Sequence, residues 1–243
     1  NDVAYHMNKV NRNYKNLVNV LGADHTGYIK RITAAVSALS ENKIKLNCKV
    51  CQLVKLFKSG KPFKMSKRAG DFISVQDLLN EVNKDLIRFM MLNRSNDVEL
   101  DFDFDKVKEK TKDNPVFYVQ YAYARINSLL RTLDINLSKQ IELNQNKFNL
   151  NEIEEKILRK VFEWPKIIGS VSRKFDLHKI PFYLYELSTL FHAYWSKGNE
   201  DKKYKFIENQ QIKREETLVM INLVAIVLQN GMRILGVSLP DKM

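Results

Sequence analysis

The hydrophobic pattern of the chain changes at the acidic segment 97–105, and this change constrains the fold more than any other feature. The part before it contains an apolar, β-branched run at 17–21, a helical period over 29–39 and a second apolar run at 50–57. The order strand, helix, strand is half of a parallel α/β unit, whose ligands bind at the carboxyl ends of the strands. We therefore expect an α/β fold for this part and treat 97–105 as a linker.

Beyond the linker, apolar residues recur at helical spacing almost throughout, which predicts a helical bundle from about residue 114 onward. Asparagine-rich loops around 136–151 form the longest break. The expected helices lie near 114–134, 152–172, 181–197 and 204–236. The predicted fold class is therefore α/β followed by all-α, with domains at 1–112 and 113–243.

Several local signals refine the first domain. Ser59 to Pro62 has the composition of a turn, and Ser74 with Asp77 fits a capping box that opens a helix. A further helix is expected over 84–92, where Asp85 and Arg88 stand three residues apart and should pair with each other.

Composition narrows the class of protein. Hydrophobic residues make up 44% and charged residues 28% of the 243 residues, as in soluble globular proteins rather than disordered ones. The longest apolar stretch, 218–228, is too short to span a bilayer, and the scarcity of cysteine favours the cytoplasm. The start at Asn1, inside a segment typical of a protein interior, suggests a fragment. A net charge of +12 indicates an anionic partner such as nucleic acid.

The basic segment 64–70 carries the clearest chemical signal. Lys64 and Lys67 stand three residues apart with Ser66 between them, and nine basic residues but no acidic one lie between Glu41 and Asp71. Ammonium groups on a loop between Gly60 and Gly70 could follow the charge that develops on a leaving pyrophosphate. The alternative is a solvated hairpin tip.

This segment resembles the KMSKS loop of class I aminoacyl-tRNA synthetases, which closes over ATP. Further short sequence segments are similar, in the same order, to segments of the C-terminal half of bacterial arginyl-tRNA synthetases. They are Asp2-Val3-Ala4-Tyr5-His6, 20–31, 64–72, 85–89, 101–105, 113–122 with Arg125, 230–231 and 235–237.

The resemblance implies ligation of arginine to tRNA(Arg) through arginyl-adenylate. It also implies the second half of a class I Rossmann-like fold, followed by a DALR-type anticodon-binding bundle. The expected partners are ATP with Mg²⁺ as substrate, L-arginine and tRNA(Arg), with no membrane, for a monomeric enzyme. No HIGH-type motif occurs in these residues, so we expect this chain alone to be inactive. The alternative is a noncatalytic tRNA-binding module derived from such a synthetase.

The resemblance also implies the nucleotide site. Lys67 is the first candidate for steadying the phosphates, with Lys64 and Ser66 assisting and Met65 beside ATP. Gly22, Asp24 and His25 correspond to the strand-end segment that meets adenosine: glycine permits close approach, and a carboxylate accepts ribose hydroxyl bonds. In the structural alternative, Asp24 caps the following helix, and His25 is structural.

Arginine itself needs an acceptor for a planar guanidinium with five donors, which a carboxylate meets best. Asp2, with Tyr5 nearby, lies where the family's arginine-contacting segment falls. The alternative is a frayed terminus.

Two further groups remain. Tyr118, Tyr121 and Arg125 could stack on or pair with unpaired anticodon bases, although aromatic residues at helical spacing often belong to a core. Tyr118 and Arg125 fall on one helix face and Tyr121 on another. Cys48 and Cys51 lack the second ligand pair that structural zinc requires, so we expect no metal site.

Overall fold

The computed structural model describes residues 1–63, 74–135 and 149–243, which divide into two compact units. Of these residues, the sheet unit comprises Asn1–Phe63 and Arg94–Phe102, and the helical unit comprises 74–93, 103–135 and 149–243. This division follows compactness, and a functional boundary after residue 112 stays a prediction.

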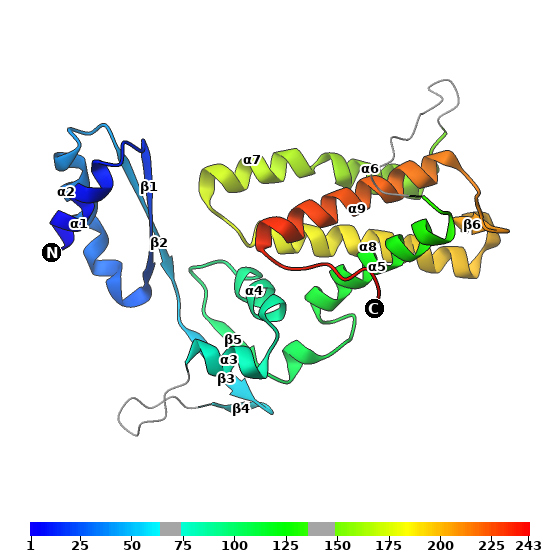
Figure 1. Ribbon diagram of the computed structural model, residues 1–243, viewed down its shortest axis with the longest axis horizontal. Helices are drawn as coiled ribbons and strands as arrows, with labels where there is room; N and C mark the ends of the chain where they lie inside the picture. Colours follow the sequence, from blue (N-terminus) through cyan, green and yellow to red (C-terminus); the bar gives the residue numbers. More distant parts are fainter. Residues whose placement is uncertain (64–73, 136–148) are drawn as a thin grey trace. The chain divides into compact units, whose positions relative to one another are not determined.

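The first sheet of the sheet unit is a parallel pair, as the order strand, helix, strand predicts, but its second strand lies at Lys45–Cys51 rather than at 50–57. Strands β1 (Asn16–Gly22) and β2 (Lys45–Cys51) run in register from Asn16 opposite Lys45 to Gly22 opposite Cys51. Helix α1 (Asp2–Val10) precedes β1, and the turn η1 (Ala23–Tyr28) leads into α2 (Ile29–Leu39). Both helices lie on one face of the pair (Figure 1). The small core consists of Leu17, Ile32, Val36 and Leu46.

The second predicted strand, 50–57, is wrong as one element. Residues up to Cys51 belong to β2, whereas β3 (Val54–Lys58) joins a different sheet with the order β4-β3-β5. The break arises because the backbone of residues 52 and 53 bonds elsewhere: Gln52 N–H donates to the Asn96 carbonyl at 2.8 Å, and the Leu53 carbonyl accepts from Leu100 at 3.2 Å.

The linker prediction for 97–105 is also wrong, because β5 (Leu100–Asp103) lies within it. Its alternating sequence buries Leu100 and Phe102 and exposes Asp101, the signature of a strand with one covered face. The turn predicted over 59–62 is confirmed at Ser59 and Gly60, whereas its last two residues form a strand. Ser59 and Gly60 have positive φ, 52° and 70°, and they connect β3 to β4 (Lys61–Pro62).

The helical unit begins with two short helices that match expectation. Ser74 and Asp77 form the predicted capping box of α3 (Val75–Glu81), and α4 spans Lys84–Leu92. The expected pair between Asp85 and Arg88 is wrong. Asp85 instead accepts from the Ser238 backbone N–H at 3.1 Å, and Arg88 Nε donates to the Leu235 carbonyl at 2.8 Å.

The bundle itself follows (Figure 1), after the short turn η2 (Lys106–Lys108). Its helices are α5 (Pro115–Thr132), α6 (Glu152–Phe162), α7 (Trp164–Lys174), α8 (Lys179–Glu200) and α9 (Glu215–Leu235). They enclose a large apolar core that includes Phe89 of α4.

Two expected helices differ from the structure. The helix over 152–172 is divided into α6 and α7 because Pro165 has no N–H for the Val161 carbonyl. The Tyr183 hydroxyl donates to the neighbouring Lys160 carbonyl at 2.5 Å. The last helix starts at Glu215 rather than near 204. The turn η4 (Lys202–Tyr204) and a hairpin of β6 (Ile207–Glu208) and β7 (Gln211–Ile212) precede it.

Helix α9 extends beyond the apolar stretch 218–228, and its 21 residues are long and apolar enough to cross a membrane by length and composition alone. In the structure it packs against α4, α5, α6 and α8, and most of its apolar residues are buried in the bundle core. We therefore interpret it as a core helix.

Candidate functional site

The basic loop cannot be placed on this structure, because Lys64, Met65, Ser66 and Lys67 lie outside the described residues. Its two ends are defined. The hairpin of β3 and β4 precedes the loop, with Phe63 N–H donating to the Leu56 carbonyl at 2.7 Å, and the capped helix α3 follows it.

The sheet unit contains a pocket of about 620 Å³ that collects four of the predicted residues: Asp2, Tyr5, Asp24 and His25. They come from α1 and η1, next to the carboxyl end of β1, the place where ligands of parallel sheets bind. The further lining residues are His6, Lys9, 18–21, Gly27, Tyr28 and Arg31.

Gly22 ends β1 beside this pocket. A Cβ atom there would lie 2.6 Å from Oδ1 of Asp24, so glycine leaves room for that carboxylate. Asp24 and His25 form a pair at 3.4 Å with side chains 81% and 56% exposed. The residue that precedes α2 is Tyr28, so the alternative in which Asp24 caps this helix is wrong.

Asp2 lies in the first turn of α1. It interacts with Tyr28 across the pocket, and the pKa of Tyr28 is raised, first by partial desolvation and then by its hydrogen bond to Asp2. Tyr5, one turn later on α1, is 55% exposed, with the Lys9 ammonium 4.6 Å from its ring centroid.

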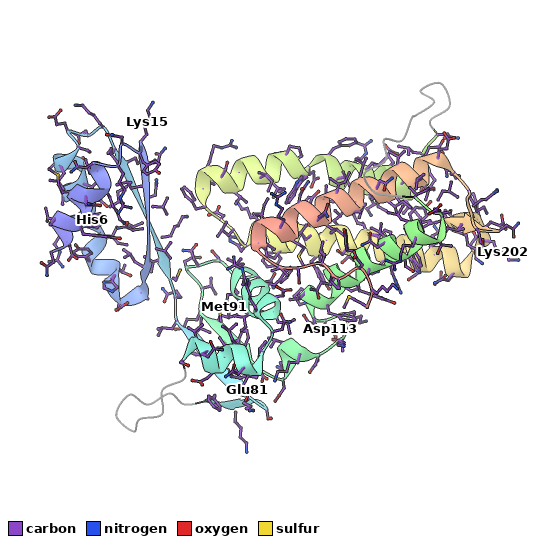
Figure 2. All side chains as sticks on the ribbon, in the orientation of Figure 1. His6, Lys15, Glu81, Met91, Asp113 and Lys202 are labelled. Carbon is purple, nitrogen blue, oxygen red and sulfur yellow. The ribbon has the colours of Figure 1, made fainter. Side chains whose placement is uncertain are left out.

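Beneath these groups lies a series of buried hydrogen bonds through His6 and Asn19 to Lys9, which the sequence analysis did not predict (Figure 2 labels His6). His6 Nδ1 donates to the Asp2 carbonyl at 2.8 Å, and its Nε2 accepts from the Asn19 amide, also at 2.8 Å. Lys9 donates to the Asn19 side-chain oxygen at 2.7 Å. The signal was available, because Asn19 is a polar residue at a core position of an apolar strand.

The helical unit brings the second predicted group together. Arg125 Nη2 donates to the Tyr121 hydroxyl at 2.9 Å, and the guanidinium lies 4.1 Å from the Tyr121 ring centroid. Tyr121 therefore lies with Arg125, contrary to the expectation that it occupies another face. The Tyr118 ring is 4.3 Å from the ring of His192 and 5.3 Å from that of Tyr185.

His192 is the residue of this cluster that the sequence did not reveal. It is 5% exposed, it contacts Arg125 Nη1 through Nδ1 at 3.0 Å, and its Nε2 lies 3.1 Å from the Tyr118 carbonyl. Burial, with a smaller contribution from Arg125, lowers the pKa of His192 to about 4. The separation of 67 residues from Arg125 leaves no local signal.

A pocket of about 570 Å³ opens beside Tyr121 and Arg125. Arg131 and Lys242 also line it, so three of its residues are cationic. Such a surface, basic with an aromatic ring at its wall, suits an anionic ligand with a planar group.

Cys48 and Cys51 belong to no group of metal ligands within the described residues. Cys48 and Cys51 are both thiols, and the described residues contain no group of three or more His, Cys, Asp and Glu side chains that could hold a metal ion.

Comparison with known proteins identifies the family of the helical part of the chain. The DALR anticodon binding domain family matches residues 119–243. The arginine–tRNA ligase of Pelagibacter ubique is 57% identical over 242 residues, which covers all of this chain and 42% of that protein. The chain therefore spans less than half the length of this curated relative.

Solved structures show the same likeness. A Campylobacter jejuni structure described as a candidate arginyl-tRNA synthetase is 28% identical, with a TM-score of 0.82, over all of this chain and 51% of that one. The Plasmodium falciparum arginyl-tRNA synthetase, at 18% identity, shares the fold with a TM-score of 0.71 over all of this chain and 44% of its own. The predicted order of an α/β part and a DALR-type bundle is confirmed. The chain belongs to the DALR anticodon binding domain family, within a sequence that is similar along its whole length to arginine–tRNA ligases.

Proposed function

We propose that this chain is part of a monomeric, cytoplasmic enzyme that joins L-arginine to tRNA(Arg) with ATP, through arginyl-adenylate. The observation that carries the proposal is the 57% identity to an arginine–tRNA ligase along the whole chain. The grouping of Asp2, Tyr5, Asp24 and His25 around one pocket supports it.

In this proposal the sheet-unit pocket receives arginine and the adenosine of ATP. The Asp2 carboxylate accepts from the arginine guanidinium, with Tyr5 beside it. Asp24 accepts from ribose hydroxyls, and Gly22 and His25 shape the wall. The exposure of the Asp24 carboxylate supports this role, because it keeps its acceptors available to a ligand.

The basic loop supplies the phosphate contacts. Lys67 stabilises charge on the departing pyrophosphate, Lys64 and Ser66 assist, and Met65 lies against the nucleotide. Mg²⁺ enters with the ATP phosphates, because proteins usually bind Mg²⁺ through substrate phosphates, waters and one or two carboxylates.

The helical unit binds the tRNA. Tyr121 and Arg125 present an aromatic face and a guanidinium beside a basic pocket, where an unpaired anticodon base with its phosphate fits. Tyr118 belongs to the same cluster, because its ring packs against the ring of His192.

The test is Lys67→Ala in the complete protein, with arginine-dependent ATP–pyrophosphate exchange and tRNA binding measured separately. We expect the rate to fall by about 10²- to 10³-fold and the Kd for tRNA to stay unchanged, because the ammonium acts on transition-state charge. The control is Lys61→Ala, which removes another of the nine basic residues between Glu41 and Asp71 and should retain the rate.

Two results would reject the proposal. One is a complete protein that binds tRNA without arginine-dependent exchange, which would indicate the noncatalytic tRNA-binding module. The other is an equal effect of the two lysine substitutions. The 243-residue chain alone should bind tRNA weakly, with strong salt dependence, and form no adenylate.

A further inference from the structure

The Arg125 guanidinium is held from several sides. Nη1 lies 3.0 Å from Nδ1 of His192, Nη2 donates to the Tyr121 hydroxyl at 2.9 Å, and the Tyr121 ring lies under the group at 4.1 Å. Trp195 lies on a further side, with its ring centroid 5.3 Å away. A long side chain ordinarily loses rotamer entropy when it binds a ligand, and these contacts remove much of that cost in advance.

The two contacts of His192 fix where its proton lies. The Tyr118 carbonyl can only accept, so Nε2, 3.1 Å away, carries the hydrogen. Nδ1 is then a lone-pair acceptor, which matches Arg125, because a guanidinium can only donate. A doubly protonated ring would direct an N–H at the guanidinium. Burial and the adjacent charge hold the pKa of His192 at about 4, so the neutral ring is the form present near pH 7.

We propose that His192 is a positioning residue for RNA binding: its neutral ring, with the proton on Nε2, links the Tyr118 backbone to Arg125 and holds the guanidinium on the face of Tyr121. This inference rests on the proposed binding of tRNA by Arg125 and Tyr121. The ligand is a single-stranded RNA segment, whose base stacks in the pocket that Ser128, Arg131 and Lys242 also line. His192 itself is buried and acts through Arg125.

A matched pair of substitutions separates positioning from mere packing. In His192→Asn the amide oxygen lies near the place of Nδ1 and can accept from Arg125. In His192→Gln the amide lies near the place of Nε2, so the bond to Tyr118 is retained and the acceptor for Arg125 is lost. Both variants replace the ring by a smaller amide, so both should lower the melting temperature.

The measurement is the Kd of the protein for its tRNA at one fixed salt concentration, alongside melting temperatures. We expect His192→Asn to bind within about threefold of wild type and His192→Gln about tenfold more weakly. If the two variants lose affinity equally, or in proportion to their melting temperatures, the role of His192 is packing and the proposal fails.

The same two His192 substitutions in an Arg125→Ala background test whether His192 acts through Arg125. We expect Arg125→Ala to weaken tRNA binding and His192→Gln to add little to it, because the residue through which it acts is gone. A full additional loss would show that His192 acts by another route. An unchanged affinity of Arg125→Ala itself would reject the proposed role of Arg125, and this inference with it.

Nitrogen-15 NMR of the histidine rings needs no substitution. At pH 7 the wild-type spectrum should show His192 neutral and protonated on Nε2. A ring protonated on Nδ1, or on both nitrogens, would overturn the proposal even if a variant failed to fold.

Discussion

Each unit contains a buried histidine that connects a backbone carbonyl to a cation lying over a tyrosine. In the helical unit, His192 contacts Arg125 directly, and Arg125 covers Tyr121. In the sheet unit, His6 reaches Lys9 only through Asn19, and Lys9 lies over Tyr5.

The two arrangements use opposite nitrogens of the ring. His6 donates from Nδ1 to the carbonyl of Asp2 on its own helix, four residues before it. His192 contacts a carbonyl on another helix through Nε2. A contact within one helix stabilises that helix locally, whereas the contact from α8 to α5 requires both helices to be packed.

The surroundings differ as well. Among the described residues, the apolar cluster of the bundle has 29 buried members, whereas the cluster that packs against the β1–β2 pair has four. The cluster of Tyr118, Tyr121, Arg125 and His192 is therefore held by a large core. The pocket of the sheet unit depends mainly on the polar contacts among its own residues.

The largest effect should come from a third buried polar group, around Glu154 in the bundle. This carboxylate is 0% exposed and pairs with Arg214 at 2.9 Å. Arg214→Met should lower the free energy of unfolding by about 3 kcal/mol, because it leaves a buried charge without its partner. Both tryptophans lie in the helical unit, so their fluorescence in urea reports its unfolding.

The control is Arg159→Met, in which an exposed pair with Glu155 is removed from the same bundle. Its cost should stay below about 0.5 kcal/mol. Equal costs for the two variants would show that the helical unit does not depend on its buried charges.

The second effect concerns pH. The pKa of His192 is lowered to about 4 from an ordinary value of 6.5, so the unfolded chain binds a proton at higher pH than the folded chain. The contribution of neutral His192 to the free energy of unfolding of the helical unit is thus fully present above about pH 6.5, and it is lost as the pH falls toward 4. Between pH 7 and pH 5 the loss due to His192 should be about 2 kcal/mol.

Urea unfolding of wild type and His192→Asn at both pH values isolates this contribution, because the other titrating groups are shared. Asp77 and Glu216, whose pKa values are lowered, lose their contributions at lower pH in both proteins. Parallel pH dependence in the two proteins would contradict the neutral, buried state of His192.

The smallest effect tests the sheet unit. Asn19→Leu removes the donor to His6 and the acceptor for Lys9, and it should destabilise β1 by about 1.5 kcal/mol. Hydrogen exchange of the β1 amides should then accelerate roughly tenfold, while exchange in α5 and α8 stays unchanged. Asn16→Leu, at an exposed position of the same strand, should leave the exchange of both units as in wild type. Acceleration in α5 would show that the units do not open independently.

Much of the fold was predictable because its signals are local. Strand β1 with the helix after it, the capping box of Ser74 and Asp77, helix 84–92 and the helical bundle all follow from spacing within a few residues. Two of the failures have local causes too. The prediction of a linker neglects the alternation over 100–103, and the prediction of one helix over 152–172 neglects Pro165.

The candidate site divides in the same way. The sequence by itself was enough to predict six candidate site residues, because residue types and their order carry the resemblance to synthetases. These residues are Asp2, Tyr5, Asp24, His25, Tyr121 and Arg125. Tertiary structure alone decided that Asp85 and Arg88 turn to the end of α9, and that His192 meets Arg125. Those partners are 67 to 153 residues apart, and only the packing of whole helices brings such side chains within hydrogen-bonding distance.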